Sequence, residues 1–146
     1  MRHLGLSGVD AAQLAEARTM APVVAVQNRY NLLDRAGEDV LRACELHGVA
    51  FVPYFPLAAG LLRTDLDPAQ IPPGMGPTAS QSGTLDAIAA RHAATRAQIA
   101  LVWLLATSPS TLLIPGTSST AHLAENTAAA SMALTADEVT ELNALR

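Results

Sequence analysis

The sequence predicts an α/β protein built on a parallel sheet. Short, nearly continuous apolar runs alternate four times with helix-like stretches along the 146 residues, and one more helical stretch follows. Strands that are apolar throughout are typical of a parallel sheet covered by helices. Half of the residues are hydrophobic and 15% are charged, so the composition favours a folded core over a disordered chain.

The expected strands are "RHLGLS", "PVVAVQ", "VAFVPYFPL" and "TLLIPG", at residues 2–7, 22–27, 49–57 and 111–116. Each is a short apolar run next to glycine, proline or polar residues. Four such strands with helices suit a small doubly wound sheet. They also suit half of a (β/α)₈ barrel, which typically needs about 250 residues. The alternation alone leaves both architectures open.

Three of the expected helices begin with a capping box, in which an N-cap side chain and the residue three positions later bond each other's backbone N–H. The spacing occurs at Asp10 with Gln13, Thr95 with Gln98, and Thr135 with Glu138. Residues 37–48 form another expected helix, whose apolar stripe contains Cys44. A further helix is expected at residues 84–93, after a Pro- and Gly-rich surface loop at 65–83.

The composition also excludes several classes of partner. The net charge is -4 and the pI is about 5.4, so the basic excess of a nucleic-acid binder is absent. The longest uncharged apolar run, residues 49–62, is too short and too interrupted by proline to span a bilayer. The four histidines show no metal-ligand spacing, and one cysteine suits a reducing, cytoplasmic compartment. We therefore expect no nucleic-acid, membrane or metal partner.

Polar, small or aromatic residues follow each expected strand, where parallel α/β folds bind ligands. A carboxamide can pair with a planar amide, an aromatic ring offers a stacking face, and backbone N–H groups before a helix can bind an anion. Together they could hold a nicotinamide dinucleotide, although no GxGxxG motif is present. Strand-end hydrogen bonding, core packing and helix capping are the structural alternatives. The residues are Ser7-Gly8, Gln27-Asn28, Tyr54-Phe55 and Gly116-Thr117-Ser118.

Four stretches, taken in order, resemble the aldo-keto reductase family. "RHLGLSG", "VVAVQNRYNLLDR", "VAFVPYFPLAAGLL" and "LIPGTSSTAHLAEN" are similar to that family's fifth, sixth, seventh and eighth barrel strands with their loops. The resemblance implies that residues 1–146 form one partial NAD(P)-dependent oxidoreductase domain. Its fold would be the C-terminal half of a TIM (β/α)₈ barrel, with four strands and their helices.

The same resemblance implies a role for each matching residue. Ser7 and Gln27 would hydrogen-bond the nicotinamide carboxamide, and Tyr54 would stack beneath the nicotinamide ring. Phe55 and Leu57 would line the pyrophosphate tunnel. The adenosine phosphate would be bound by Gly116, Thr117, Ser118 and His122, and the adenine by Glu125 and Asn126.

Three departures from the family pattern affect these expectations. Gly8 stands where the family usually has asparagine. Gly116 and His122 stand where many NADP-preferring members have lysine and arginine, so NADP is the expected cofactor and NAD the alternative. The family's catalytic Tyr, Lys, Asp and His lie in the first half of its barrel, and this chain contains no lysine. No catalytic residue is therefore expected here.

Two functions from different classes follow. The first is the cofactor-binding half of an aldehyde or ketone reductase, completed by an N-terminal half-barrel. The second is a non-catalytic half-barrel that binds nucleotide or pairs with a second copy of itself. An unrelated doubly wound domain is a third, more distant possibility.

Overall fold

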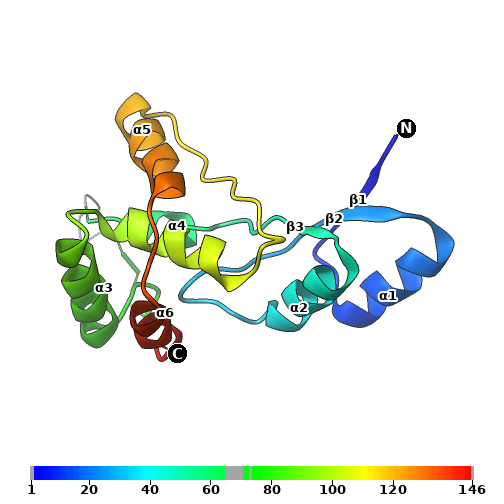
Figure 1. The fold of residues 1–146 in the computed structure, drawn as a ribbon, viewed down its shortest axis with the longest axis horizontal. Helices are drawn as coiled ribbons and strands as arrows, with labels where there is room; N and C mark the ends of the chain where they lie inside the picture. The colour runs from blue at the N-terminus through cyan, green and yellow to red at the C-terminus, as the bar shows by residue number, and fades with distance from the viewer. Residues whose placement is uncertain (1, 65–70, 73, 146) are drawn as a thin grey trace.

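A computed structural model of the chain describes residues 2–64, 71–72 and 74–145. Its sheet contains three parallel strands in the order β1-β2-β3, at Leu4–Ser7, Val23–Gln27 and Ala50–Phe51. The helices α1 (Ala11–Met20) and α2 (Glu38–His47) connect successive strands and lie on the same side of the sheet (Figure 1). The expected parallel α/β fold is confirmed.

The fourth expected strand is reduced to one parallel bridge, between Phe51 and Thr111. The Phe51 N–H donates to the Ser110 carbonyl at 2.8 Å, and the Leu112 N–H donates to the Phe51 carbonyl at 2.8 Å. Beyond Leu112 the chain leaves the sheet and crosses to α5 (Thr120–Ala128), as the yellow segment of Figure 1 shows. Residues 113–116 therefore lie outside the sheet instead of extending it.

The third strand is shorter than expected because it contains two prolines, which have no N–H to donate to a ladder. Pairing with β2 nevertheless continues past Ala50–Phe51. The Val52 N–H donates to the Val26 carbonyl at 2.8 Å, and the Tyr54 N–H donates to the Asn28 carbonyl at 2.9 Å. Pro53 lies between these two bonds. This alignment places Tyr54 beside the end of β2.

The three expected capping boxes are present, at the starts of α1, α4 (Arg96–Thr107) and α6 (Ala136–Asn143). The helix expected at residues 84–93 is present as α3, but its predicted start was wrong. This helix spans Ala79–Arg91 and begins five residues earlier than expected, because Thr78 and Gln81 form a fourth capping box. Residues 65–70 and 73 of the expected loop lie outside the described residues.

The core is centred on α4, which is buried on most of its surface. Trp103 of this helix stacks on Tyr30 with ring centroids 5.9 Å apart, and Tyr30 meets Phe51 edge-on at 5.8 Å. The Trp103 indole N–H donates to the Asn143 Oδ1 at 2.9 Å, which connects α4 to α6. Cys44 is fully buried in the same core, as expected for an unreactive thiol.

Large apolar side chains are exposed on β2 and on the segment that follows the Phe51–Thr111 bridge. Val24, Leu112 and Ile114 are 42%, 57% and 44% exposed. Within the described residues, β1 pairs only with β2, so its other edge has no strand partner. An exposed edge together with exposed apolar side chains indicates a surface that another polypeptide could cover.

Candidate functional site

A cavity of about 490 Å³ lies between the turn that follows β3, residues 114–117 and α5. Its volume is in the range of small-molecule and cofactor sites. It brings together seven of the residues that the family resemblance assigned: Tyr54, Phe55, Leu57, Gly116, Thr117, His122 and Asn126. Pro56, Ala59, Gly60, Arg63, Ile114 and Pro115 complete its lining.

The turn after β3 has an unusual backbone. Phe55, Ala58 and Ala59 have φ angles of 55°, 51° and 57°, in the left-handed region that residues with a Cβ rarely adopt. Each such residue costs about 1–2 kcal/mol. A short 3₁₀ turn, η1 (Ala58–Gly60), follows from this geometry. Backbone strain of this kind often marks a functional site, and here it shapes one wall of the cavity.

Asn31 holds the strained turn in place. Its side chain is fully buried, and its Nδ2 donates to the Phe55 carbonyl at 3.0 Å. Its Oδ1 accepts from the backbone N–H groups of Leu33 and Asp34, so the amide is fixed from both ends. The Phe55 ring contacts the Tyr54 ring edge-on at 5.4 Å and lies 5.8 Å from the guanidinium carbon of Arg29.

The opposite wall begins at the N-terminus of α5. Ser119 is the N-cap, and its Oγ accepts from the His122 N–H at 3.3 Å. The Thr117 Oγ1 accepts from the Ser119 N–H at 3.1 Å. Gly116 and Thr117 face the cavity, whereas Ser118 is exposed and does not line it. Helix capping therefore explains Ser119, whereas Gly116 and Thr117, which precede it, line the cavity.

Asn126 has a buried side-chain oxygen that lacks a hydrogen-bond donor within the described residues. Its side chain is 8% exposed and lines the cavity, yet its Oδ1 has no hydrogen-bond partner among the described residues. A buried polar atom without a partner costs about 1–3 kcal/mol. A ligand that donates an N–H into the cavity would remove this cost.

Glu125 lies beside the main cavity in a smaller hollow of about 250 Å³, which Arg63 and His122 also line. Its carboxylate pairs with the Arg63 guanidinium, with 3.2 Å between Nη2 and Oε2. The Thr95 hydroxyl donates to the other carboxylate oxygen. The structure thus joins Glu125 to Arg63, which had no predicted role, and to Thr95, which was predicted only as a helix cap.

Ser7 and Gln27 lie apart from the cavity lining, at the ends of β1 and β2, where they are partners in register. The Gly8 N–H donates to the Gln27 carbonyl at 3.0 Å. Gly8 has a φ of 66°, which explains a residue without a side chain at this position. Ser7 is exposed and Gln27 half-buried, so both remain accessible beyond the strand ends.

Sequence reasoning missed Asn31 and Arg63, and it named Asn28 as a strand-end residue without giving it a separate role. The Asn28 amide bonds both backbone groups of Val9 and so fixes the loop after β1, with its Nδ2 2.6 Å from the Val9 carbonyl. Asn28 directly follows β2, which was the available signal for it, whereas Asn31 lies four residues beyond the end of that strand. Arg63 had no local signal, because its partner Glu125 is 62 residues away.

The described part of the chain contains neither a metal-binding cluster nor a membrane-spanning helix. No group of three or more His, Cys, Asp or Glu side chains there is arranged to hold a metal ion. None of the described helices has the length and apolar character needed to cross a membrane.

Comparison with known proteins gives a consistent result. A family model described as "Aldo/keto reductase family" matches residues 1–146. The chain is 43% identical over 145 residues to pyridoxine 4-dehydrogenase of Escherichia coli, covering 99% of this chain and 45% of that protein. It is 40% identical over 144 residues to an uncharacterized oxidoreductase of Schizosaccharomyces pombe, covering 98% of this chain and 42% of that protein.

Solved structures of reductases match the fold of this chain over nearly its whole length. A thermostable aldo-keto reductase in complex with the inhibitor epalrestat superposes with a TM-score of 0.85 at 34% identity, covering 99% of this chain and 48% of that one. A putative 2,5-diketo-D-gluconic acid reductase B gives a TM-score of 0.77 at 29% identity, with coverages of 99% and 45%. The chain thus spans about half the length of the relatives it matches.

Proposed function

The chain belongs to the aldo/keto reductase family, and from this membership we propose that it is the cofactor-binding half of an NAD(P)H-dependent reductase of aldehydes or ketones. The proposed domain comprises residues 1–146, with strands equivalent to the fifth to eighth of the barrel. A complementary N-terminal half-barrel would supply the remaining strands. We propose the cytoplasm as its compartment.

The observation that carries this proposal is the unpartnered Oδ1 of Asn126 in the cavity wall. The exocyclic amine of adenine is a donor that would satisfy it. Thr117 and the backbone at Gly116 would meet phosphate oxygens, and Tyr54 offers a ring face near the strand ends. Ser7 and Gln27, adjacent at the ends of β1 and β2, would orient the carboxamide. The residues present therefore suit a nicotinamide dinucleotide.

The bound nicotinamide would supply the hydride. The residues of this chain would bind and orient the dinucleotide, and the strained turn at Phe55 would keep one cavity wall fixed around it. The proton for the carbonyl oxygen must come from elsewhere, because the resemblance assigns the family's catalytic residues to the other half. We therefore propose that reduction requires that half.

A two-part experiment tests this function. First, NADPH is titrated into the purified chain by calorimetry, alongside the Asn126→Leu and Thr127→Ala variants. Asn126→Leu should weaken binding about tenfold, since it removes the acceptor while roughly keeping the volume. Thr127→Ala, at an exposed neighbour on α5, should bind normally. Normal binding by Asn126→Leu would reject the adenine assignment.

Second, the chain is joined to the half of the Escherichia coli relative that it does not match. Aldehyde reduction is then compared with that of the chain alone. We expect turnover only in the joined protein, since general acid catalysis is typically worth about 10²–10⁴-fold. Robust turnover by the chain alone would contradict the proposed division of roles.

A second candidate function is a self-associating, non-catalytic half-barrel. The exposed side chains of Val24, Leu112 and Ile114 favour it, because a second copy could cover them. Nucleotide binding without turnover in the joined protein, together with a stable homodimer, would support this alternative.

A further inference from the structure

Arg63 occupies a central position between the hollows of the site. It lines both the main cavity and the smaller hollow that contains Glu125, and His122 lines the same two. The Arg63 side chain is only 15% exposed and its partner Glu125 is 19% exposed. An arginine so little exposed has lost most of its contact with water, and it needs anionic or polar partners at fixed positions.

Glu125, whose carboxylate pairs with Arg63, is held both at its carboxylate and at its backbone. The Thr95 hydroxyl donates to one of its oxygens, and the Gln98 Nε2 donates to the Glu125 carbonyl at 3.1 Å. Thr95 and Gln98 belong to the capping box of α4, which is buried in the core. Glu125 therefore sets the position of the Arg63 guanidinium relative to the rigid part of the molecule.

The charge of the cavity depends on Arg63. Among the described residues that line the main cavity, Arg63 alone has a permanent positive charge, and Tyr54 and His122 are the other titratable groups. Position 116, where many NADP-preferring relatives have a lysine, is a glycine in this chain. A guanidinium is planar, with five N–H donors in a fork that suits a phosphate.

We propose that Arg63 is the phosphate-binding cation of this cavity, positioned by Glu125, and that it replaces the positive charges absent at positions 116 and 122. Its ligand would be a phosphate group at the adenosine end of the dinucleotide. This inference rests on the proposed nucleotide-binding function. Glu125 acts on the ligand through Arg63 and is a positioning residue in this arrangement.

The test uses three probes that differ in their phosphates: adenosine 2′,5′-bisphosphate, ADP and adenosine. Each is titrated by calorimetry into the wild-type chain and into Arg63→Met, Arg63→Lys and Arg96→Met. Arg96 is a matched control, because it pairs with Asp86 and does not line the main cavity. Circular dichroism checks that each variant is folded.

Arg63→Met should weaken binding of a phosphorylated probe about tenfold or more and change adenosine binding by less than about twofold. If the affinity falls only for adenosine 2′,5′-bisphosphate, the ligand of Arg63 is the 2′-phosphate. If the affinity for ADP falls as well, the ligand is the 5′-diphosphate. Arg63→Lys should recover part of the affinity. The salt dependence of binding should flatten in Arg63→Met, because one charge contact is gone.

Two other outcomes would overturn the proposal in distinguishable ways. If the wild-type chain binds the probes and Arg63→Met binds all of them equally well, or if Arg96→Met loses as much affinity, only the role of Arg63 is wrong. If the wild-type chain binds none of the three probes or NADPH, the nucleotide-binding function fails, and this inference fails with it.

Discussion

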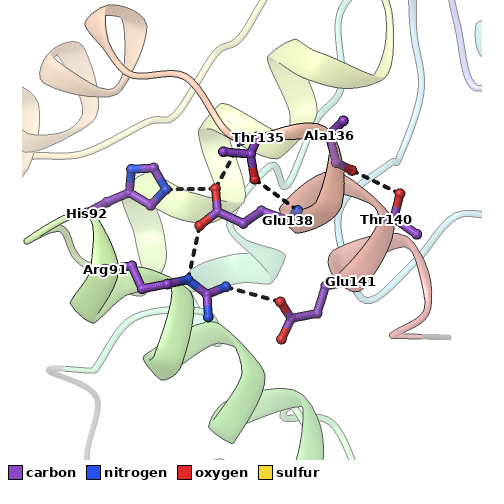
Figure 2. A network of polar contacts seen from close by, with 7 residues as sticks. All are labelled: Arg91, His92, Thr135, Ala136, Glu138, Thr140 and Glu141. Atoms are coloured by element: carbon purple, nitrogen blue, oxygen red, sulfur yellow. Dashed lines mark hydrogen bonds and ion pairs between the residues drawn. The ribbon is translucent and has the colours of Figure 1, made fainter.

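The imidazole Nε2 of His92 lies 2.9 Å from a carboxylate oxygen of Glu138, and this contact joins the end of α3 to the first turn of α6. Figure 2 shows the same carboxylate accepting from the Thr135 backbone N–H and from the Arg91 guanidinium, which also reaches Glu141. Glu138 is buried despite its charge. Three groups, from the end of α3 and the start of α6, therefore converge on one carboxylate.

We predict that Glu138→Gln destabilises the protein in a pH-dependent way. The Thr135 backbone N–H, followed by His92 and Arg91, lowers the pKa of Glu138 from 4.5 to about 2. A carboxylate with a lowered native pKa stabilises the fold above its unfolded pKa and loses this contribution as pH falls. The free energy of unfolding should therefore differ most between wild type and variant above about pH 5 and converge toward pH 2.

Denaturant titrations at several pH values measure this difference. Glu141→Gln is the control, because Glu141 pairs with the same Arg91 but its side chain is 45% exposed. Such an exposed pair is worth about 0–1 kcal/mol. A difference for Glu138→Gln that does not change between pH 6 and pH 3 would show that packing, not the ionised carboxylate, joins α3 to α6.

We predict that His122→Arg tightens NADPH binding by about tenfold and leaves NADH binding nearly unchanged. His122 lines the cavity at the start of α5, and an arginine there would add a fixed charge for a 2′-phosphate. Leu123→Arg is the control, since Leu123 is adjacent in sequence, 57% exposed and absent from the main cavity lining. Equal tightening of both cofactors would place the 2′-phosphate elsewhere.

We predict that Cys44 resists thiol reagents in the native protein. Burial raises the pKa of its thiol to about 11, with a smaller opposing effect from Arg18, and its side chain is fully buried. The thiolate is the reactive form, so labelling with Ellman's reagent at pH 8 should proceed only through unfolding. Rapid, complete labelling without denaturant would mean that α2 opens readily.

We predict that the isolated chain self-associates at concentrations of roughly tens of micromolar, through the face of the sheet that exposes Val24 and Leu112. Replacing Leu112 by lysine should lower the average mass seen by sedimentation, because this side chain is 57% exposed directly after the last bridge of the sheet. Leu46→Lys is the control, at a 79% exposed position on α2. If Leu46→Lys has the same effect, association depends on general hydrophobicity and not on this face.

The parts of the fold that could be predicted from sequence were those set by local patterns. The capping boxes at Asp10, Thr95 and Thr135 need only four residues each, and all three are present. The residues after Thr111 have a strand-like composition, but a strand also needs neighbours with which to pair. Composition cannot supply that information, so residues 113–116 were predicted as strand and lie outside the sheet.

The residues of the candidate site likewise include some that the sequence could predict and some that it could not. Tyr54, Gly116 and Thr117 lie at or near the C-terminal ends of predicted strands, so their position near a ligand could be inferred from order alone. The position of Arg63 at the site could not be inferred in this way. It depends on the ion pair with Glu125, which is far away in sequence and becomes a neighbour only in the folded chain. The strain at Phe55 was equally invisible, since phenylalanine gives no sequence signal for a left-handed backbone.

The strand order of the sheet has a consequence for how the chain folds as it is made. Each strand pairs with the strand synthesised just before it, and Thr111 then pairs with β3. Contacts between successive units favour rapid folding, and domains can form while translation continues. Each βα unit can therefore dock onto a finished neighbour as it leaves the ribosome. The edge at Thr111 is completed last, whereas the outer edge of β1 is made first and has no strand partner within the described residues, so it is the edge that is open longest during synthesis.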